Sequence, residues 1–455
     1  MQRFFAMGAA LAVAAWCAAG TQIEAAETKF DPKAVTIRSP KEFTARGGLP
    51  NFYRKLAEGK HVKIAYLGGS ITQQKGWRVL SLNYFREMYP KSEAEEVYAA
   101  IGGTGSQLGS FRLEQDVLRH KPDLLFVEFA VNDGGYPTDE IRRGMEGIVR
   151  HTWRELPETD ICFVYTLTDK GINGILEGRI SRAASVMEDV ADYYNIPSVH
   201  FGVEVAKLVK DGKMIMKADS KGMTIVSGEG LNIASKVPMT ADGKVPFAKD
   251  GVHPYLNTGH VIYTNTLKKV LPEIAKAGTP GPHALPPPVM KDNYEFAGAV
   301  SLDDPALKLS GKITKLGPTD PPVKPSFRLF MPDVWKLEPG ATIEFRFKGT
   351  KILLYNIRGP GCGYAEITID DQKPINEYSF DTHGTYYRIA CNSLPLLDGD
   401  KVHTVKIKVA EEPFDKRKFL AGRKADSSDI DKNPEKYAKQ DLYIAAIFIC
   451  GELVK

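Results

Sequence analysis

Two short segments, far apart in the chain, carry side chains suited to nucleophilic acyl transfer. Ser70 stands in the run 68–72 (Gly-Gly-Ser-Ile-Thr), and Asp250 precedes His253 by three residues in the run 250–254 (Asp-Gly-Val-His-Pro). A serine hydroxyl is a poor nucleophile at neutral pH and needs an adjacent base. A carboxylate placed three residues before an imidazole on a turn can accept from Nδ1, which leaves Nε2 free to take the serine proton.

Each segment also has an ordinary structural explanation. A strand followed by Gly-Gly-Ser is typical of a plain α/β connection or of a phosphate-binding turn, and Asp250 could cap a turn beside a surface histidine. His260, on the segment that follows, fits a packing or surface residue better than a second base. Only the combination of Ser70, Asp250 and His253 supplies the nucleophile, its base and the group that orients the base.

Three groups could stabilise the oxygen that becomes negative during acyl transfer. If Ser70 begins a helix, its own N–H points to the place where this oxyanion forms. Asn132, in the run 129–133 (Phe-Ala-Val-Asn-Asp), offers a neutral amide, with an Asx turn as the alternative. The glycine turn over 102–105 could add a backbone N–H, or be only a tight turn.

The elements that must position these residues alternate between strands and helices over residues 62–280. Apolar strands are predicted at 62–67, 97–101, 124–129, 160–167 and 196–201, and helices at 76–89, 108–119, 138–156, 181–194 and 256–277. Repeated strand–helix units predict a three-layer α/β/α domain of flavodoxin-like type with a parallel sheet. The active site of such a sheet lies beyond the carboxyl ends of its strands, where Ser70, Asn132 and the 250–254 run fall.

The pattern of polar and apolar residues changes after a proline-rich segment. Residues 279–298, which contain Thr-Pro-Gly-Pro at 279–282 and three prolines at 286–288, predict a stiff linker. Residues 299–455 carry several short stretches of alternating polarity separated by turns. They predict an antiparallel β-sandwich domain of jelly-roll-like type. The segment 211–249, which has no clear periodicity, predicts a flap or hairpin near the pocket.

Composition excludes several classes of protein. The chain has 455 residues, 43% hydrophobic and 25% charged, with a formal net charge of only +4, which suits a soluble two-domain globular protein. So small a charge provides no field that would hold nucleic acid. The locally basic run 416–424 predicts a flexible surface loop, with contact to an acidic polymer as the alternative.

The N-terminal segment has the organisation of a secretory signal peptide. Arg3 is followed by an apolar run over 4–19, too short to span a bilayer comfortably, and then by small residues up to Ala26. Residues 1–26 therefore predict a signal peptide and a secreted or periplasmic protein without membrane insertion; a membrane anchor is the alternative.

The cysteines are too sparse for a disulfide framework. Cys162 sits in an apolar strand and predicts a buried thiol, whereas one bridge among Cys362, Cys391 and Cys450 could form in an oxidising compartment, with no pairing favoured. No spacing of cysteine and histidine suggests a zinc site.

In combination, these blocks resemble the SGNH (GDSL-type) hydrolase superfamily over about residues 60–278. The family is named for four residues in four blocks, and Ser70, Gly103, Asn132 and His253 are the matching candidates, with Asp250 completing the triad. Gly103 is preferred within its turn because it precedes Asn132 by a usual family interval. The resemblance implies a hydrolase domain over 27–278 that needs no metal or cofactor. It also implies that the Ser70 N–H, the Gly103 N–H and the Asn132 amide form the oxyanion hole.

Two positions depart from the family pattern. The first block usually reads Gly-Asp-Ser, but Gly69 replaces the aspartate; the third usually reads Gly-x-Asn-Asp, but Ala130 replaces the glycine. Neither position donates the key atoms, so activity is expected to survive, although the substrate is less certain in a divergent branch. Asp133 is expected to hold the Asn132 loop by hydrogen bonds.

A secreted domain of this family joined to a sandwich resembles carbohydrate esterases that remove O-acetyl groups from a polysaccharide or oligosaccharide. The expected partner is therefore an acetylated carbohydrate. Aromatic residues of the sandwich could stack on its sugar rings, although core packing is the favoured explanation for each of them; these are Trp335, Tyr364, Tyr386 and Tyr387.

Two other functions remain open. One is a lipase or thioesterase with the same triad, and the other is a non-catalytic glycan-binding protein on an esterase scaffold. The sequence leaves open the polysaccharide, the acetyl position and the oligomeric state.

Overall fold

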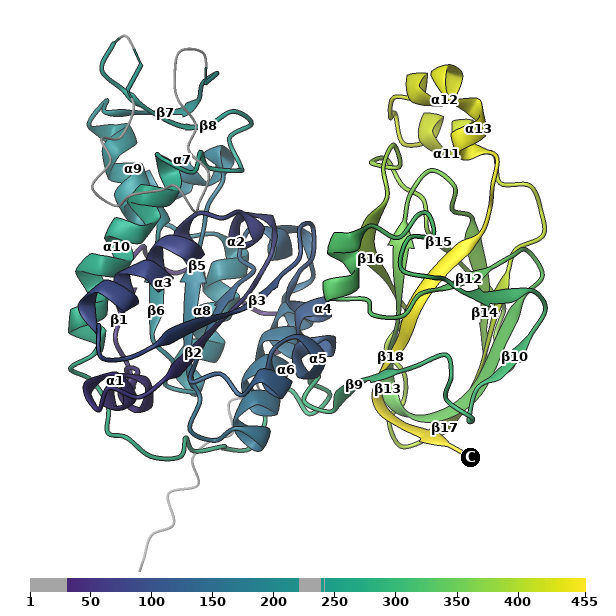
Figure 1. Ribbon diagram of the computed structural model, residues 1–455, viewed down its shortest axis with the longest axis horizontal. Coiled ribbons are helices and arrows are strands. Elements are labelled where there is room, and N and C mark those ends of the chain that lie inside the picture. The colour runs from purple at the N-terminus through teal and green to yellow at the C-terminus, as the bar shows by residue number, and fades with distance from the viewer. Residues whose placement is uncertain (1–30, 221–238, 241) are drawn as a thin grey trace, which may run out of the picture.

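The computed structural model describes residues 31–220, 239–240 and 242–455, which form an α/β domain and a β-sandwich domain lying side by side (Figure 1). The predicted signal segment, 1–26, lies outside the described residues. Within these described ranges, no helix combines the length and apolar character needed to cross a bilayer.

The α/β domain is built on a six-stranded sheet in the order β1-β6-β5-β4-β2-β3. The strands from β2 to β6 run parallel, and β1 pairs antiparallel with β6 at one edge. The bounds are β1 (Phe43–Thr44), β2 (Val62–Gly68), β3 (Ala94–Ala100), β4 (Leu124–Glu128), β5 (Asp160–Tyr165) and β6 (Ser198–His200).

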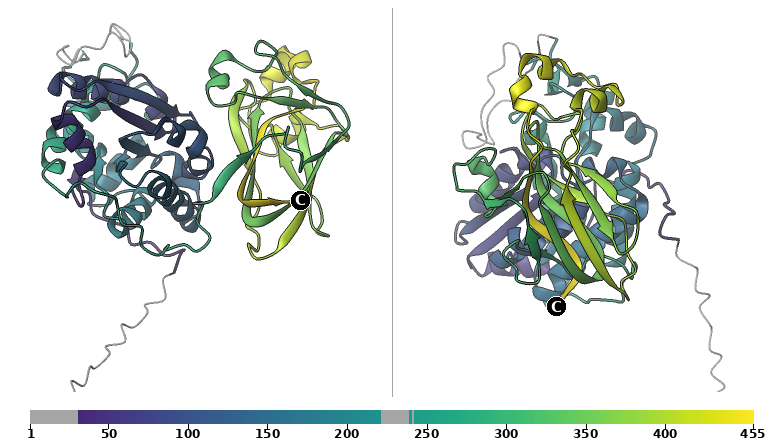
Figure 2. Two further views of the ribbon diagram at one scale, coloured as in Figure 1. Left: turned by 60° about the horizontal axis from the view of Figure 1, so that its bottom comes forward. Right: turned by 90° about the vertical axis from the view of Figure 1, so that its right-hand side faces the viewer.

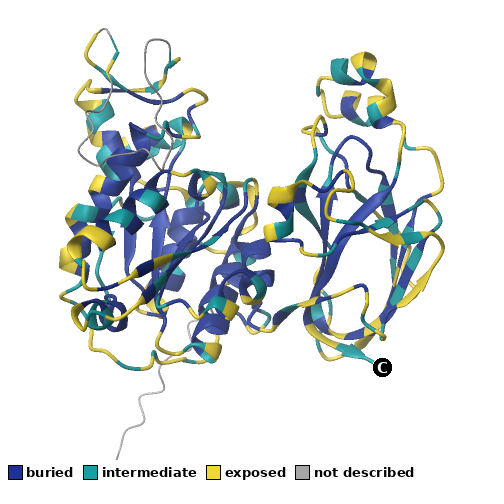
Figure 3. Ribbon diagram, in the orientation of Figure 1, coloured by how far each residue is buried: buried dark blue, intermediate teal, exposed yellow. Residues whose placement is uncertain are grey.

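Alternate side chains of each strand enter two separate cores. Ile64 and Tyr66 of β2 face the core formed with α1, α3, α9 and α10, whereas Ala65 and Leu67 face the core formed with α6 and α8. The helix bounds are α1 (Pro50–Ala57), α3 (Trp77–Met88), α6 (Thr138–Glu155), α8 (Arg182–Tyr193), α9 (Gly202–Lys210) and α10 (Gly259–Ile274). Because both faces are covered, the central strands β4 and β5 are buried throughout (Figure 3), and the predicted three-layer α/β/α fold is confirmed.

The helix predicted over 108–119 is divided in the structure into α4 (Ser106–Phe111), α5 (Leu113–Asp116) and a short 3₁₀ helix. The residues on either side of Arg112 pack differently: Phe111 enters a core shared with the sandwich, whereas Leu113 enters the core beneath the sheet.

Two short strands stand above the carboxyl edge of the sheet. β7 (Met214–Lys217) and β8 (Val245–Ala248) pair in parallel, so the described parts of the predicted 211–249 flap do not form an antiparallel hairpin. Residues 221–238 and 241 of this segment lie outside the described residues. Two short helices complete the domain, α2 (Ser70–Gln73) and α7 (Ile172–Leu176).

The C-terminal domain is a ten-stranded sheet, all of whose pairs are antiparallel, and the predicted antiparallel architecture is confirmed. The long strand β13 (Thr342–Arg358) organises it, pairing with β17 along its first half, β16 along its second half and β18 for most of its length. The other bounds are β9 (Ala297–Val300), β10 (Lys308–Ser310), β11 (Ile313–Lys315), β12 (Trp335–Leu337), β14 (Tyr364–Ile369), β15 (Ile375–Tyr378), β16 (Arg388–Ser393), β17 (Val402–Val409) and β18 (Leu442–Val454).

A single apolar cluster joins the two domains. Phe111 of α4 packs against Phe448 of β18 and against Tyr294, with ring centroids 6.1 and 5.0 Å apart. Burying such side chains stabilises a contact by about 2 kcal/mol each. The two domains therefore meet through a shared core, although they separate above it (Figure 2).

The first six residues of the basic run 416–424 form a helix, α11 (Lys416–Ala421), and not the predicted loop, and a turn follows at 422–424. This helix forms a cap on the sandwich with α12 (Ser428–Lys432) and α13 (Pro434–Tyr437). Lys416 is buried, and its ammonium donates to the carbonyl oxygens of Pro360, Tyr437 and Lys439 at 2.6–2.7 Å. These carbonyls replace its lost water, which is why a buried lysine can begin this helix.

Candidate active site

The nucleophile candidate stands at a sharp turn between β2 and α2. Gly69 is the residue before α2, and Ser70 is the first residue of that helix. The turn leaves no room for a side chain at position 69, because a Cβ atom there would overlap Oδ1 of Asn132. The aspartate of the family pattern would therefore fit here only if the Asn132 side chain moved.

The structure brings Ser70, His253 and Asp250 into one hydrogen-bonded series. The Ser70 hydroxyl lies 2.8 Å from Nε2 of His253, and Nδ1 of that ring lies 2.7 Å from Oδ2 of Asp250. This arrangement lets the imidazole accept the serine proton while the carboxylate holds the ring in the required tautomer. The side chains of His253 and Asp250 are 42% and 51% exposed, so the series opens to solvent and to a substrate.

The loop that carries the acid and the base is fixed by its own backbone. Oδ1 of Asp250 accepts the N–H groups of Val252 and His253, each at 2.8 Å. Partial burial alone would raise the pKa of Asp250, but these bonds and the His253 ring outweigh it and lower that pKa to about 2. Gly251 has φ +79°, and its carbonyl accepts the Asp169 N–H at 2.7 Å, which ties the loop to the end of β5.

His260 is a buried positioning residue, as its packing interpretation predicted. Its Nδ1 accepts the Trp77 N–H at 3.1 Å, so Nε2 carries the proton and donates to Oε1 of Gln74 at 3.1 Å. Gln74 in turn donates to the carbonyl of Pro254 at 3.3 Å, which links the serine helix to the histidine loop. Burial lowers the pKa of His260 to about 3 and keeps this ring neutral. Gln74 carries no motif, and sequence reasoning missed it.

The three predicted oxyanion donors come from three loops that converge on Ser70. Asn132 begins a 3₁₀ helix (Asn132–Gly135) after β4, and its side chain lies against Gly69. Gly103 lines the same cleft as Ser70 and has φ +76°, a conformation that favours glycine. A Cβ atom on the neighbouring Gly102 would lie 3.5 Å from the Ser70 Cβ, which shows how closely this turn approaches the nucleophile.

Two buried carboxylates support these loops. Glu128, at the end of β4, accepts the hydroxyls of Thr72 at 2.8 Å and Thr166 at 2.6 Å. Asp133 accepts the Ser106 N–H at 3.0 Å, as expected for a residue that holds the Asn132 loop. Burial raises the pKa of Glu128, and it raises the pKa of Asp133 to about 7. The supporting role of Glu128 was not predicted. In the sequence, a glutamate at the end of a buried strand looks like any other polar residue that ends a strand.

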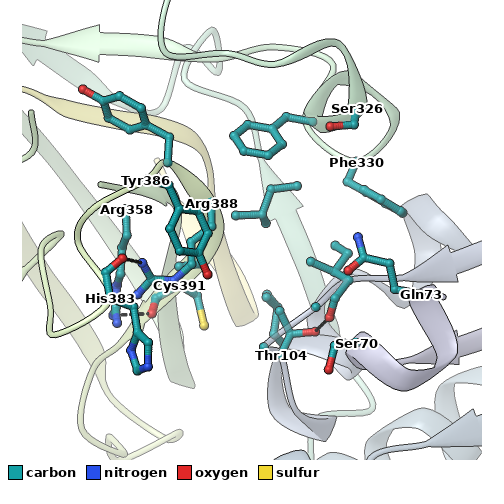
Figure 4. Close-up of a pocket in the computed structure, with 18 of the residues that line it drawn as sticks. Ser70, Gln73, Thr104, Ser326, Phe330, Arg358, His383, Tyr386, Arg388 and Cys391 are labelled. Carbon is teal, nitrogen blue, oxygen red and sulfur yellow. Dashed lines mark hydrogen bonds between the residues drawn. The ribbon is translucent and has the colours of Figure 1, made fainter. Parts of the chain in front are cut away.

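Ser70 opens into a cleft of about 770 Å³ between the two domains. Tyr386, Arg358 and Arg388 of the sandwich face Ser70 and Thr104 of the α/β domain across it (Figure 4). Of the four aromatics considered for sugar stacking, Tyr386 and Tyr387 line this cleft. Trp335 is buried in the sandwich core, and Tyr364 stacks on Tyr378 and Phe414 instead.

The four cysteines that the structure describes form no bridge. Cys162, Cys362, Cys391 and Cys450 are all free thiols, and Cys162 is fully buried in β5 as predicted. Within the described part of the chain, no three His, Cys, Asp or Glu side chains are grouped to hold a metal ion.

Comparison with known proteins gives a family and a fold. Residues 66–221 match the model of the GDSL-like Lipase/Acylhydrolase family. No curated protein matches the chain. Among solved structures, a two-domain esterase active on acetylated mannans, crystallised with mannopentaose, is 19% identical, with a TM-score of 0.63 over 90% of this chain and 97% of that one. A second structure described as a two-domain esterase active on acetylated mannans is also 19% identical, with a TM-score of 0.64 over 90% of this chain and 97% of that one.

At this level of identity the structural likeness establishes a shared two-domain fold. The family match covers the end of β2, Ser70, the glycine turn over 102–105 and Asn132. Residues 66–221 are thus similar to the GDSL-like Lipase/Acylhydrolase family.

Proposed function

We propose that this chain is a serine esterase that removes O-acetyl groups from a polysaccharide or oligosaccharide. The observation that carries the proposal is the series from the Ser70 hydroxyl through His253 to Asp250, with separations of 2.8 and 2.7 Å, at the floor of a cleft shared with a β-sandwich. The similar two-domain esterase that acts on acetylated mannans supports the choice of substrate class.

The mechanism follows from the positions of these groups. His253 takes the hydroxyl proton as Ser70 Oγ attacks the acetyl carbonyl carbon. The resulting oxyanion accepts from the N–H groups of Ser70 and Gly103 and from the Asn132 amide. The sugar oxygen then leaves with the proton from His253, and an acetyl-enzyme remains. Water, deprotonated by the same ring, attacks this ester and releases acetate and free serine.

The sandwich contributes the outer wall of the substrate site in this proposal, with Tyr386 as an exposed ring on which a sugar can stack. The domain boundaries that we propose are a signal peptide at 1–26, a hydrolase domain at 27–278, a linker at 279–298 and the sandwich at 299–455. Export with removal of residues 1–26 places the enzyme outside the cytoplasm. The N-terminal sequence of the exported protein tests this part.

The direct test of the activity is the substitution Ser70→Ala assayed with p-nitrophenyl acetate. Turnover should fall by at least about 10³-fold while the melting temperature is retained. Ser326→Ala is a matched control, because Ser326 lines the same cleft from the sandwich side. A Ser70→Ala enzyme that kept wild-type rates would exclude the mechanism.

A panel of acyl chain lengths separates the alternatives. The proposal expects acetate esters to be hydrolysed faster than octanoate esters, whereas a lipase would show the reverse order. Wild-type protein that binds glycans but hydrolyses no ester would be a binding protein on an esterase scaffold. Release of acetate from acetylated mannan, xylan and pectin then narrows the polysaccharide.

A further inference from the structure

The cleft wall that faces Ser70 carries an excess of positive charge. Its side chains include three permanent cations, Lys324, Arg358 and Arg388. Among the described residues that line the cleft, Asp381 supplies the one carboxylate. Charges gathered on the walls of a cleft focus the potential inside it and attract ions of the opposite sign.

Asp381 holds the two arginines in fixed positions and does not neutralise both. Arg388 hydrogen-bonds to its carboxylate, and Nη1 of Arg358 lies 3.5 Å from the same oxygen. The arginines also donate to neutral groups of the backbone, Arg388 to the carbonyl of His383 at 3.2 Å and Arg358 to that of Cys391 at 2.8 Å. Two guanidinium groups around one carboxylate leave one positive charge uncompensated.

The pKa of Asp381 is consistent with this role. Burial alone would raise this pKa, but the hydrogen bond and the charge of Arg388 lower it below its usual value. Asp381 is therefore ionised at neutral pH and keeps both arginines at the cleft wall.

Lys324 adds a second uncompensated charge. It is exposed, it donates to the carbonyl of Tyr387 at 3.2 Å, and it forms no ion pair with any residue that the structure describes. Tyr386 lies between the cations: Nζ of Lys324 is 5.9 Å and the guanidinium carbon of Arg388 is 5.8 Å from the centre of its ring. A sugar stacked on this 53% exposed ring would bring its substituents close to both cations.

We propose that the cleft selects acetylated glycans that are themselves anionic, carrying either uronic-acid carboxylates or sulfate esters. This inference rests on the proposed esterase function and names the class of substrate on which it acts. Guanidinium groups bind carboxylate and sulfate oxygens through paired N–H donors, and a repeated anion along the glycan suits cations spread over one wall. A neutral mannan chain would leave this charge unused.

The kinetic test compares two acetylated polymers with the same enzyme. The value of kcat/KM for acetate release should be higher on acetylated polygalacturonate than on acetylated glucomannan, and only the former should fall as NaCl is raised, because salt screens exposed charges. Equal or lower activity on this polymer at low salt would exclude uronate recognition, and the same result with an acetylated carrageenan would overturn the inference.

The variant Lys324→Gln removes one cation without touching the triad. It should lower kcat/KM on acetylated polygalacturonate by about three- to fivefold and leave the rates on acetylated glucomannan and p-nitrophenyl acetate unchanged. Lys308→Gln is the matched control, since Lys308 lies on exposed strand β10 at the sandwich edge remote from the cleft (Figure 1). An equal loss on both polymers for Lys324→Gln would contradict a charge-selective role.

A binding experiment keeps the inference separate from the esterase proposal. Calorimetry with the Ser70→Ala chain measures affinity for oligogalacturonate, for a sulfated carrageenan oligosaccharide and for mannopentaose. Tighter binding of one charged ligand than of mannopentaose supports the inference and identifies the anion. Failure of wild-type protein to hydrolyse p-nitrophenyl acetate would refute the esterase proposal alone, whereas preference for mannopentaose would refute the anionic substrate alone.

Discussion

Gly69 and the Asn132 side chain occupy adjoining space so tightly that a Cβ atom at position 69 would overlap Oδ1 of the amide. The contact couples the turn before the nucleophile to a predicted oxyanion donor. It also explains why this chain departs from the family pattern at that position. An aspartate there would need Asn132 to move.

The first prediction concerns this contact. Gly69→Ala should lower kcat on p-nitrophenyl acetate by about 10²-fold, because the added methyl group displaces an oxyanion donor. Gly134→Ala is the control: Gly134 lies two residues after Asn132, and a Cβ atom there meets nothing within 4 Å. Equal kcat values for the two variants would show that the Gly69 contact does not position Asn132.

The second prediction tests Asn132 directly. Asn132→Ala should reduce kcat by about 10²–10³-fold with little change in the melting temperature. The exposed Asn265 on α10 provides a control, Asn265→Ala, that should keep full activity. An Asn132→Ala enzyme that kept the wild-type kcat would exclude this amide from the oxyanion hole.

The third prediction concerns Glu128 beneath the serine turn. Glu128→Ala leaves the Thr72 and Thr166 hydroxyls without their acceptor in the core, which should lower the free energy of unfolding by about 3 kcal/mol. Glu128→Gln keeps one acceptor oxygen and should lose less. Chemical denaturation measures both values, and Glu87→Ala on the exposed face of α3 is the control. If the Glu128→Ala protein were as stable as wild type, Glu128 would not support the serine turn.

The sequence predicted the parts of the site that are local. Ser70, Asn132 and His253 each follow a strand or precede a helix within a few residues, and parallel strands bring their carboxyl ends to one edge of the sheet whatever the intervening length. The residue types then indicate the chemistry. This is why the triad and the layer architecture could be predicted without coordinates.

The parts that were missed depend on packing between distant segments. The bond from His260 to Gln74 joins residues 186 positions apart, and neither residue has a distinctive neighbourhood in the sequence. The cleft exists because Phe111 and Phe448 pack together and bring Arg358 and Arg388 opposite Ser70. An arginine in a strand of alternating polarity indicates only that this face of the strand is exposed to solvent. The position of Arg358 and Arg388 at the active site could therefore not be predicted from the sequence.

The last prediction uses the raised pKa of Asp133. Burial raises this pKa from its ordinary value of 3.8 to about 7, so between these pH values the folded protein keeps a proton that the unfolded chain releases. Stability contributed by this group should therefore fall as pH rises from about 4 to about 7 and stay level above that range. Asp133→Asn, which resembles the protonated acid, should melt at a higher temperature than wild type at about pH 8, and this advantage should shrink towards about pH 5. Thermal melts across this range check the sign.

The exposed Asp426 provides the control. Hydrogen bonds from Ser428 lower the pKa of Asp426, so Asp426→Asn should show no such advantage at high pH. An Asp133→Asn protein whose difference from wild type did not change with pH would mean that Asp133 is already ionised in the folded state throughout this range, held by the Ser106 N–H at 3.0 Å.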